Sequence, residues 1–245
     1  MKAGKEFIEK TKYANLAASD QQSGKPAPPL ELACDAESSM DLPREQPAVS
    51  LDLTAAIGRR QSVRNYQDEP LSLSELSYLL WCTQGVKQTY GGRTSRTVPS
   101  AGGRHALETW LVVNKVAGLT PGLYRYSAVS HRLTLLTAAV DGDIGELSAE
   151  LCRGQQFVTQ AAALFIWVAV PYRMTWRYND RGYRYLFLDA GHVCQNLYLA
   201  AEGIGAGVCA IAAYDDDRLN AFLGLDGENA FAVYLAAAGK RQPVF

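Results

Sequence analysis

The stretch that most constrains the fold is "YRYLFLDAGHVCQNLYLAAEGIG", residues 183–205. On a helix, its apolar residues would lie on most sides instead of along one stripe. Such a helix must be deeply buried or lie at a subunit interface. The apolar run "AAALFIWVAV", residues 161–170, is too short to span a bilayer and predicts a central β-strand. A chain of 245 residues that is 48% hydrophobic can bury both.

Helical and strand-like patterns mix along the chain without the regular alternation of a doubly wound sheet. This mixture favours an α+β fold over a Rossmann-like α/β fold. Helices are expected over 5–17, 50–60, 72–85, 141–154, 183–205 and 215–225, and strands over 107–115, 122–126, 131–136, 161–170, 208–214 and 229–241.

The first 50 residues differ in composition from the rest. After a short amphipathic stretch they are rich in Pro, Ser and acids, which predicts an extended or irregular arm over 1–50. A compact domain is expected over 51–245. Its first helix has Ser50 or Asp52 as a plausible N-cap, and Ser72 and Glu75 have the spacing of a capping box.

Charge, cysteine content and the N-terminal sequence argue against several classes of protein. A net charge of −1 and a pI near 6.3 argue against nucleic-acid binding and give no reason to expect anionic membranes as partners. Five cysteines, an odd number without a C-x-x-C pair, favour a reducing cytoplasm over a disulfide framework. The N-terminus shows no apolar signal-peptide core.

Several familiar motifs are absent or in the wrong context. The glycines of "EGIGAGV", residues 202–208, follow a helix and precede a strand, so helix-stop and turn roles are favoured over a dinucleotide fingerprint. No P-loop or G-x-S-x-G pattern occurs, and the three histidines lack metal-ligand spacing. His192, three residues after Asp189, is expected to be a core histidine, and no metal site is predicted.

Three basic or small-residue segments resist such ordinary explanations. In "RRQSVRNY", Arg60, Ser62 and Arg64 alternate and would project to one side of an extended stretch, which suits a phosphate or a polar heterocycle. A solvated basic turn fits this segment equally well. The run of small residues after Pro99 would let the backbone approach a flat ligand, unless it is simply a flexible loop. Lys240 and Arg241 end the last strand as a possible second phosphate clamp.

Together these segments resemble the flavin-dependent nitroreductase family, and within it the branch of SagB and the McbC-like azoline dehydrogenases. The resemblance runs from about residue 51 to residue 241 and rests on six pieces in family order. They are "RRQSVRNY", "LSELSYLLWCTQG", "RTVPSAGGRHALETWLVV", "GLYRY", "YRYLFLDAGHVCQNLYLAAEGIGAG" and "GKR". It implies an α+β sandwich with a central, mostly antiparallel sheet flanked by helices. It also implies an intertwined homodimer that shares two FMN sites at its interface.

The resemblance also assigns the cofactor-binding residues. Arg60, Ser62 and Arg64 would hold the phosphate, ribityl and pyrimidine edge of FMN. The segment of the partner subunit that lies against the flavin ring would be the small-residue loop, and backbone N–H groups after residue 211 would lie near flavin N5. A cation beside N1 and O2 would stabilise the reduced flavin. The remaining implied FMN contacts are Pro99, Ser100, Ala101, Gly102, Ala212, Ala213, Lys240 and Arg241.

The implied chemistry is hydride transfer through flavin N5 in a ping-pong cycle, with NAD(P)H as co-substrate and a nitroaromatic or quinone acceptor. Azoline dehydrogenation, or a non-catalytic flavin-binding role in a peptide-modifying complex, is the alternative. Azoline-oxidising members carry a Lys-Tyr pair where this chain has Arg177 and Tyr178, and arginine is a poor proton shuttle at neutral pH. Tyr178 and Tyr185, with Tyr183, remain candidates for a general acid or for substrate contacts.

Overall fold

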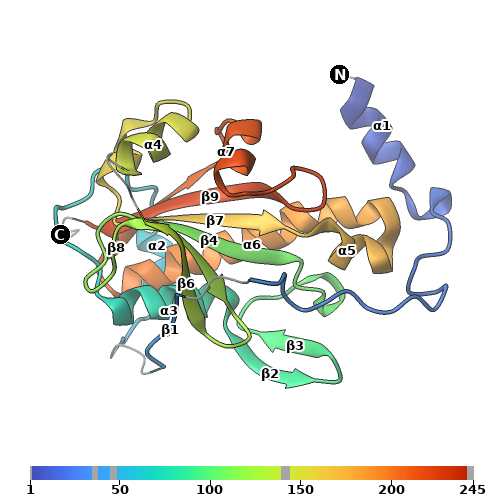
Figure 1. Cartoon of the computed structure of the whole chain (residues 1–245), viewed down its shortest axis with the longest axis horizontal. Helices are drawn as coiled ribbons and strands as arrows, with labels where there is room; N and C mark the ends of the chain where they lie inside the picture. The colour runs from blue at the N-terminus through green and yellow to red at the C-terminus, as the bar shows by residue number, and fades with distance from the viewer. Residues whose placement is uncertain (1, 35–37, 45–48, 139–143, 242–245) are drawn as a thin grey trace.

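A seven-stranded antiparallel sheet forms the centre of the molecule (Figure 1). The computed structural model describes residues 2–34, 38–44, 49–138 and 144–241. The strand order is β1-β6-β5-β4-β7-β9-β8. The strands are β1 (Ser39–Asp41), β4 (Leu107–Val113), β5 (Gly122–Ser127), β6 (Arg132–Ala138), β7 (Ala163–Ala169), β8 (Ala206–Ile211) and β9 (Phe231–Lys240).

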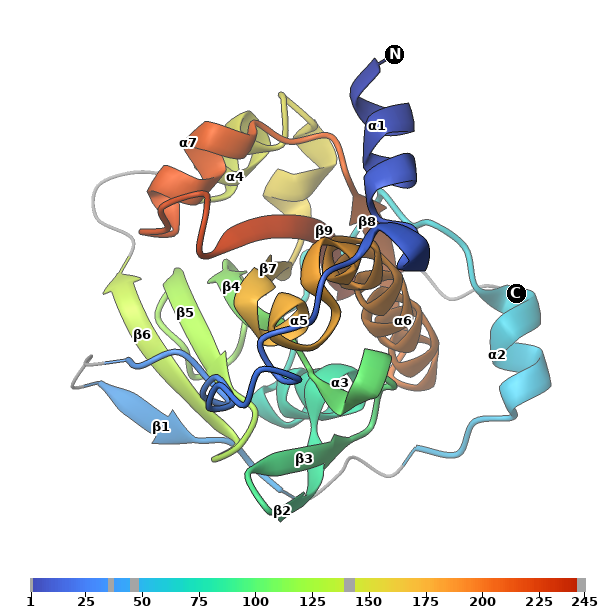
Figure 2. The ribbon, with the colours of Figure 1, turned by 90° about the vertical axis from the view of Figure 1, so that its right-hand side faces the viewer.

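Helices cover both faces of this sheet, as Figure 2 shows. One face packs against α3 (Leu73–Gln84), α5 (Pro171–Tyr178) and α6 (Gly182–Gly203), and the other against α4 (Ile144–Leu151) and α7 (Asp216–Phe222). Each face has its own cluster of buried apolar side chains, and every residue of β4 and β7 is buried. The predicted α+β architecture is therefore confirmed.

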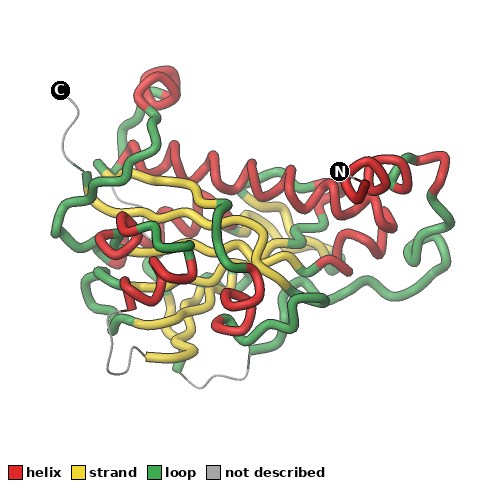
Figure 3. The backbone as a smooth tube through the Cα atoms, turned by 90° about the horizontal axis from the view of Figure 1, so that it is seen from above, coloured by secondary structure: helices red, strands yellow, loops and turns green. Residues whose placement is uncertain are grey.

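The predicted helix starts follow local hydrogen-bond chemistry. Asp52, not Ser50, caps α2 (Leu53–Arg59), because its carboxylate accepts from the Ala55 N–H at 2.7 Å. Ser72 and Glu75 form the predicted capping box at the start of α3. α6, the long apolar helix, runs along the sheet for much of the length of the molecule (Figure 3).

One stretch of that helix was predicted wrongly. His192 is exposed instead of lying in the core, because Phe187, Leu188 and His192 share the side of α6 that faces away from the sheet. The helix is apolar on this side as well, but no described residue covers Phe187 or Leu188. Their exposed fractions are 56% and 60%.

The first 50 residues contain the predicted N-terminal helix, which ends earlier than expected, and a strand that the composition does not predict. They contain α1 (Lys2–Lys10), the short turn η1 (Tyr13–Asn15) and β1, which pairs with β6 as the last strand at one edge of the sheet. The boundary at residue 51 stays a prediction. Within the described ranges, no helix is long and apolar enough to cross a membrane.

Candidate functional site

The basic segment, residues 60–64, follows the end of α2 and runs beside the outer edge of β8. Val63 donates its N–H to the carbonyl of Val208 at 2.9 Å, and Ser62 forms a parallel bridge with Val208. Gly207 allows this approach, because a Cβ there would lie 2.6 Å from the Cβ of Val63. The segment is thus extended, as the alternation of its residues predicts.

Tyr198 of α6 connects the basic segment to β8. Its hydroxyl lies 3.1 Å from the Ser62 hydroxyl and accepts the Ala210 N–H at 2.8 Å. The guanidinium of Arg60 lies 5.3 Å from the centre of the same ring. Arg64 points elsewhere, with its guanidinium 5.8 Å from the ring of Phe157. Arg60 and Ser62 therefore both contact Tyr198, whereas Arg64 contacts Phe157.

The three residues nevertheless offer donors without strong competitors. No described carboxylate lies within ion-pair distance of Arg60 or Arg64, and Ser62 and Arg64 are exposed. Ala212 and Ala213 are also exposed and follow directly after β8. These groups lie along the same edge of the sheet, as a polyanionic cofactor with a flat ring requires.

Lys240 and Arg241 are differently placed. The ammonium of Lys240 binds Glu75 at 2.5 Å and the carbonyl of Ile204 at 3.2 Å. Arg241 makes two bonds to the carboxylate of Glu202, at 3.0 and 2.6 Å, and this carboxylate is 3.8 Å from Arg59. Both cations are already neutralised, so a phosphate would have to compete with two carboxylates that sequence reasoning did not pair with them.

The small-residue loop lies at the other end of α6. Gly102 has φ +57°, and a Cβ there would lie 2.4 Å from the hydroxyl of Tyr178 and 3.1 Å from Arg177. The Ser100 hydroxyl accepts the His105 N–H at 2.9 Å, which closes the turn. The structure therefore brings the loop of Pro99–Gly102 against the Arg177–Tyr178 pair.

Asp189 is a site residue that sequence reasoning missed. Its Oδ1 accepts the Ala101 N–H at 3.2 Å, and its Oδ2 has no hydrogen-bond partner among the described residues. Burial raises the pKa of Asp189, against the opposite effect of the Ser100 hydroxyl and of that N–H. Its place on a long apolar helix was the available signal, since a buried carboxyl needs a reason to be there.

Next to this loop lies a cluster of tyrosines. The rings of Tyr178 and Tyr185 meet edge to face at 4.9 Å, and Arg181 donates to the Tyr185 hydroxyl at 2.7 Å. Tyr13 of the N-terminal segment lies 3.0 Å from the same hydroxyl. Burial raises the pKa of Tyr185, so its phenol keeps its proton at neutral pH. Tyr183 stacks on Phe231 instead, at 6.5 Å.

The predicted residues thus fall into two groups within one chain. The basic segment lies near Tyr198, whereas the loop and the tyrosines lie near Tyr185. Tyr198 lies thirteen residues after Tyr185 on this helix, a distance of about 20 Å along its axis. One chain alone does not bring the two groups together.

A model of the nitroreductase family matches residues 57–240. The chain belongs to the nitroreductase family. It is 36% identical over 166 residues to "Putative nitroreductase MJ1384" of Methanocaldococcus jannaschii, which covers 67% of this chain and 80% of that protein. The crystal structure of a Ralstonia eutropha JMP134 protein, also named a putative nitroreductase, superposes with a TM-score of 0.69 at 26% identity. It covers 90% of this chain and 97% of the other.

A second relative is a protein of trifolitoxin processing. The trifolitoxin-processing protein TfxB of Rhizobium leguminosarum bv. trifolii is 31% identical over 140 residues. The match covers 56% of this chain but only 37% of TfxB, so this nitroreductase-family chain spans about a third of that relative.

Proposed function

We propose that this protein is an FMN-dependent oxidoreductase that works as a homodimer in the cytoplasm. Each FMN would lie between the basic segment of one subunit and the Pro99–Gly102 loop of the other. The bound flavin would supply hydride transfer through N5. NAD(P)H is the proposed donor, and a nitroaromatic or quinone is the proposed acceptor. Five cysteines that all carry free thiols suit a reducing compartment.

The observation that carries this proposal is the separation of the two groups along α6. Between them, Phe187 and Leu188 are exposed on the same helix, and Leu53 and Ile57 are exposed on α2, at 61% and 56%. Exposed apolar side chains on neighbouring helices are typical of a protein interface. A second subunit that packs on this surface would bring the basic segment of one chain to the loop of the other.

The chain's own residues divide the proposed work. Arg60 and Arg64 would bind anionic groups, and the exposed backbone after β8 would approach the ring. Both arginines connect to this part of the chain through a neighbour. Arg60 lies over Tyr198, which bonds to Ala210, and Arg64 lies over Phe157, close in sequence to Gln155, which bonds to Ala213. Tyr178 and Tyr185 would face the substrate, where Tyr185 can donate a hydrogen bond while it keeps its proton. Lys240 and Arg241 would join the phosphate site only if Glu75 and Glu202 release them.

FMN retention tests the proposal. Purified protein is expected to be yellow and to release one FMN per chain on denaturation. Replacing Arg60 and Arg64 together with Ala should weaken FMN binding by roughly 10- to 100-fold for each arginine, because each would lose a charge-assisted hydrogen bond. Arg59→Ala is the matched control and should retain FMN. A colourless protein that cannot be reconstituted with FMN overturns the proposal.

The match to a trifolitoxin-processing protein favours a second candidate. In it, the chain oxidises azolines in a modified peptide, or binds flavin as a non-catalytic partner in a peptide-modifying complex. Steady-state oxidation of NAD(P)H with menadione or a nitroarene distinguishes the candidates. Turnover by the protein alone supports the first, and turnover that requires a partner protein supports the second.

A further inference from the structure

Three charged side chains lie buried together beside the sheet. Glu108 of β4 binds Arg125 of β5 and Arg173 of α5, at 2.6 Å in each case. Only 4%, 9% and 2% of these side chains, in that order, are exposed. Trp110 packs under Arg125, with its ring centre 5.2 Å from the guanidinium. Burial of three charges is costly unless their hydrogen bonds are satisfied.

These side chains form their remaining hydrogen bonds with the main chain of residues 29–33. Arg173 donates to the carbonyl of Pro29 at 2.8 Å, and Glu108 accepts the N–H of Leu32 at 2.6 Å. Arg125 donates to the carbonyls of Leu32 and Ala33, at 2.5 and 2.7 Å. All of the atoms held in this way are backbone atoms, so the three side chains recognise the main chain of this segment.

One side chain of this segment is also held. The carboxylate of Glu31 accepts the Ser127 hydroxyl at 2.6 Å and the Val129 N–H at 3.0 Å. Pro29 and Ala33 are exposed, so the segment lies at the surface instead of inside the core. Nη1 of Arg173 is buried and has no hydrogen-bond partner in the described ranges, which leaves the site one spare donor.

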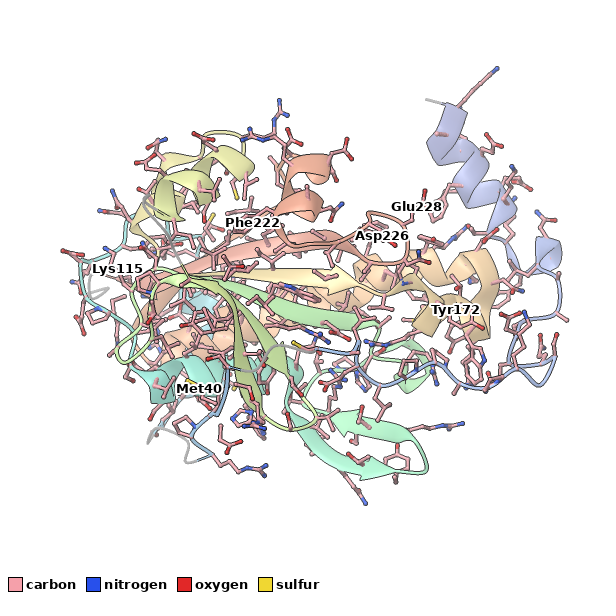
Figure 4. All side chains as sticks on the ribbon, viewed as in Figure 1. Met40, Lys115, Tyr172, Phe222, Asp226 and Glu228 are labelled. Carbon is pink, nitrogen blue, oxygen red and sulfur yellow. The ribbon has the colours of Figure 1, made fainter. Side chains whose placement is uncertain are left out.

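The N-terminal segment also contacts α5, toward the tyrosine cluster. Trp176 donates its indole N–H to the carbonyl of Lys25 at 3.1 Å and accepts the Gln21 N–H at its own carbonyl at 2.8 Å. Tyr172, labelled on α5 in Figure 4, donates to Asp20 at 2.9 Å. Asn179 donates to the carbonyl of Ala17 at 2.6 Å. Most of these contacts again involve the main chain of the N-terminal segment.

We propose that Glu108, Arg125 and Arg173 form a binding site for a peptide segment, which they recognise through the peptide main chain. Residues 29–33 are its tethered occupant. This segment bends at Leu30 and Glu31 and none of its residues is in a strand, so the site holds a peptide that does not join the sheet. The site is independent of FMN and stands apart from the proposed redox function.

The test converts the tethered occupant into a separate peptide. A protease recognition sequence is placed between Cys34 and Ser38 of the full chain, the folded protein is cleaved there, and size-exclusion chromatography follows fragment 1–34. The fragment is expected to stay bound. A fluorescent synthetic peptide of residues 1–34 in excess should then replace it at one peptide per chain, measured by fluorescence anisotropy.

Two modified peptides give a matched comparison. N-methylation of Leu32 removes the N–H that binds Glu108 and should weaken binding by about tenfold or more. N-methylation of Leu30, whose N–H makes no hydrogen bond to a described residue, should leave binding unchanged. Because these peptides leave the protein body intact, a failure to fold cannot explain the difference.

Protein variants complete the test. Arg125→Gln should release the fragment, whereas Arg132→Gln, whose partner Asp41 is a surface residue, should not. The proposal is overturned if the fragment leaves and the labelled peptide does not bind, if the fragment never exchanges, or if both methylated peptides bind equally well. The FMN content of the cleaved protein is measured in parallel, so either result leaves the redox proposal to its own test.

Discussion

Gly102 shows how closely a single residue determines the predicted site. Its lack of a Cβ makes room for the Tyr178 hydroxyl, and its φ of +57° is one that other residues rarely adopt. Gly103, the next residue, has φ +62° but no heavy atom within 4 Å of where a Cβ would lie. The two glycines therefore share the backbone requirement and differ only in what they contact.

This pair yields a prediction at the scale of the residue. Gly102→Ala should lower the free energy of unfolding by roughly 1–3 kcal/mol more than Gly103→Ala, because only the former displaces Tyr178. Urea denaturation of both variants measures the difference. Equal losses would show that backbone strain alone matters and that Tyr178 does not depend on the loop.

His105 provides a second prediction at this scale, for acid stability. Burial, with Arg96 nearby, lowers the pKa of His105 to about 3. The unfolded chain takes up the proton near pH 6.5 and the folded chain does not. This contribution to stability is fully present above pH 6.5 and is lost as the pH falls toward 3. By pH 4 the loss should be on the order of 3 kcal/mol.

The measurement compares unfolding free energies at pH 7 and pH 4. His105→Asn should lose less stability over this range than the unmodified protein, because Asn tolerates the positive φ of 46° at this position but does not titrate. His192→Gln changes an exposed histidine and should behave like the unmodified protein. Parallel losses in all three proteins would contradict the assignment.

At the scale of the element, the first turn of α3 is bonded to the last strand, β9. Ser72 accepts the Glu75 N–H at 3.2 Å, Glu75 accepts the Ser72 N–H at 2.9 Å, and the other oxygen of Glu75 binds Lys240. Ser72→Ala should cost about 1 kcal/mol in unfolding free energy. Ser74→Ala in the first turn of the same helix should cost little, because the Ser74 hydroxyl makes no hydrogen bond to a described residue. A thermal or urea melt distinguishes the two.

Local patterns predicted most of the elements because local chemistry determines them. The capping box, the Asp52 cap and the alternation of the β5–β6 hairpin all lie within a few residues of what they control. The hairpin of β2 (Val86–Tyr90) and β3 (Arg93–Arg96) was not among the predicted elements, although Gly91-Gly92 is a hairpin signal. β1 was missed because its three residues carry no strand pattern of their own and depend on pairing with β6.

The candidate site was only partly predictable, because many of its contacts depend on the folded chain and not on neighbours in the sequence. The alternation of Arg60, Ser62 and Arg64 predicts an extended basic segment, but not that Tyr198 binds two of the three. The ion pairs of Lys240 and Arg241 join residues far apart in sequence, as do the contacts of Asp189 with Ala101 and of Tyr13 with Tyr185. Spacing along one chain contains no information about such pairs.

The whole molecule presents an apolar surface that a single chain leaves open. Leu188→Glu would place a charge in the proposed subunit interface and should raise the dimer dissociation constant by about 100-fold or more, with loss of FMN. Leu147→Glu on α4, where Leu147 is 37% exposed on the opposite face of the sheet, is the control. Light scattering coupled to size exclusion measures both. A dimer that survives Leu188→Glu would place the interface elsewhere.

β1 has a consequence for self-association of this protein. Among the described residues, Ser39–Asp41 and the carbonyl of Ser38 are the groups that pair with the outer side of β6. A chain that began at residue 51 would leave the hydrogen-bonding groups of β6 unpaired along a sheet edge, which is a template for another copy's strand. The N-terminal residues thus protect against edge-to-edge self-association, and trimming them for crystallisation or assay would favour aggregation over a smaller enzyme.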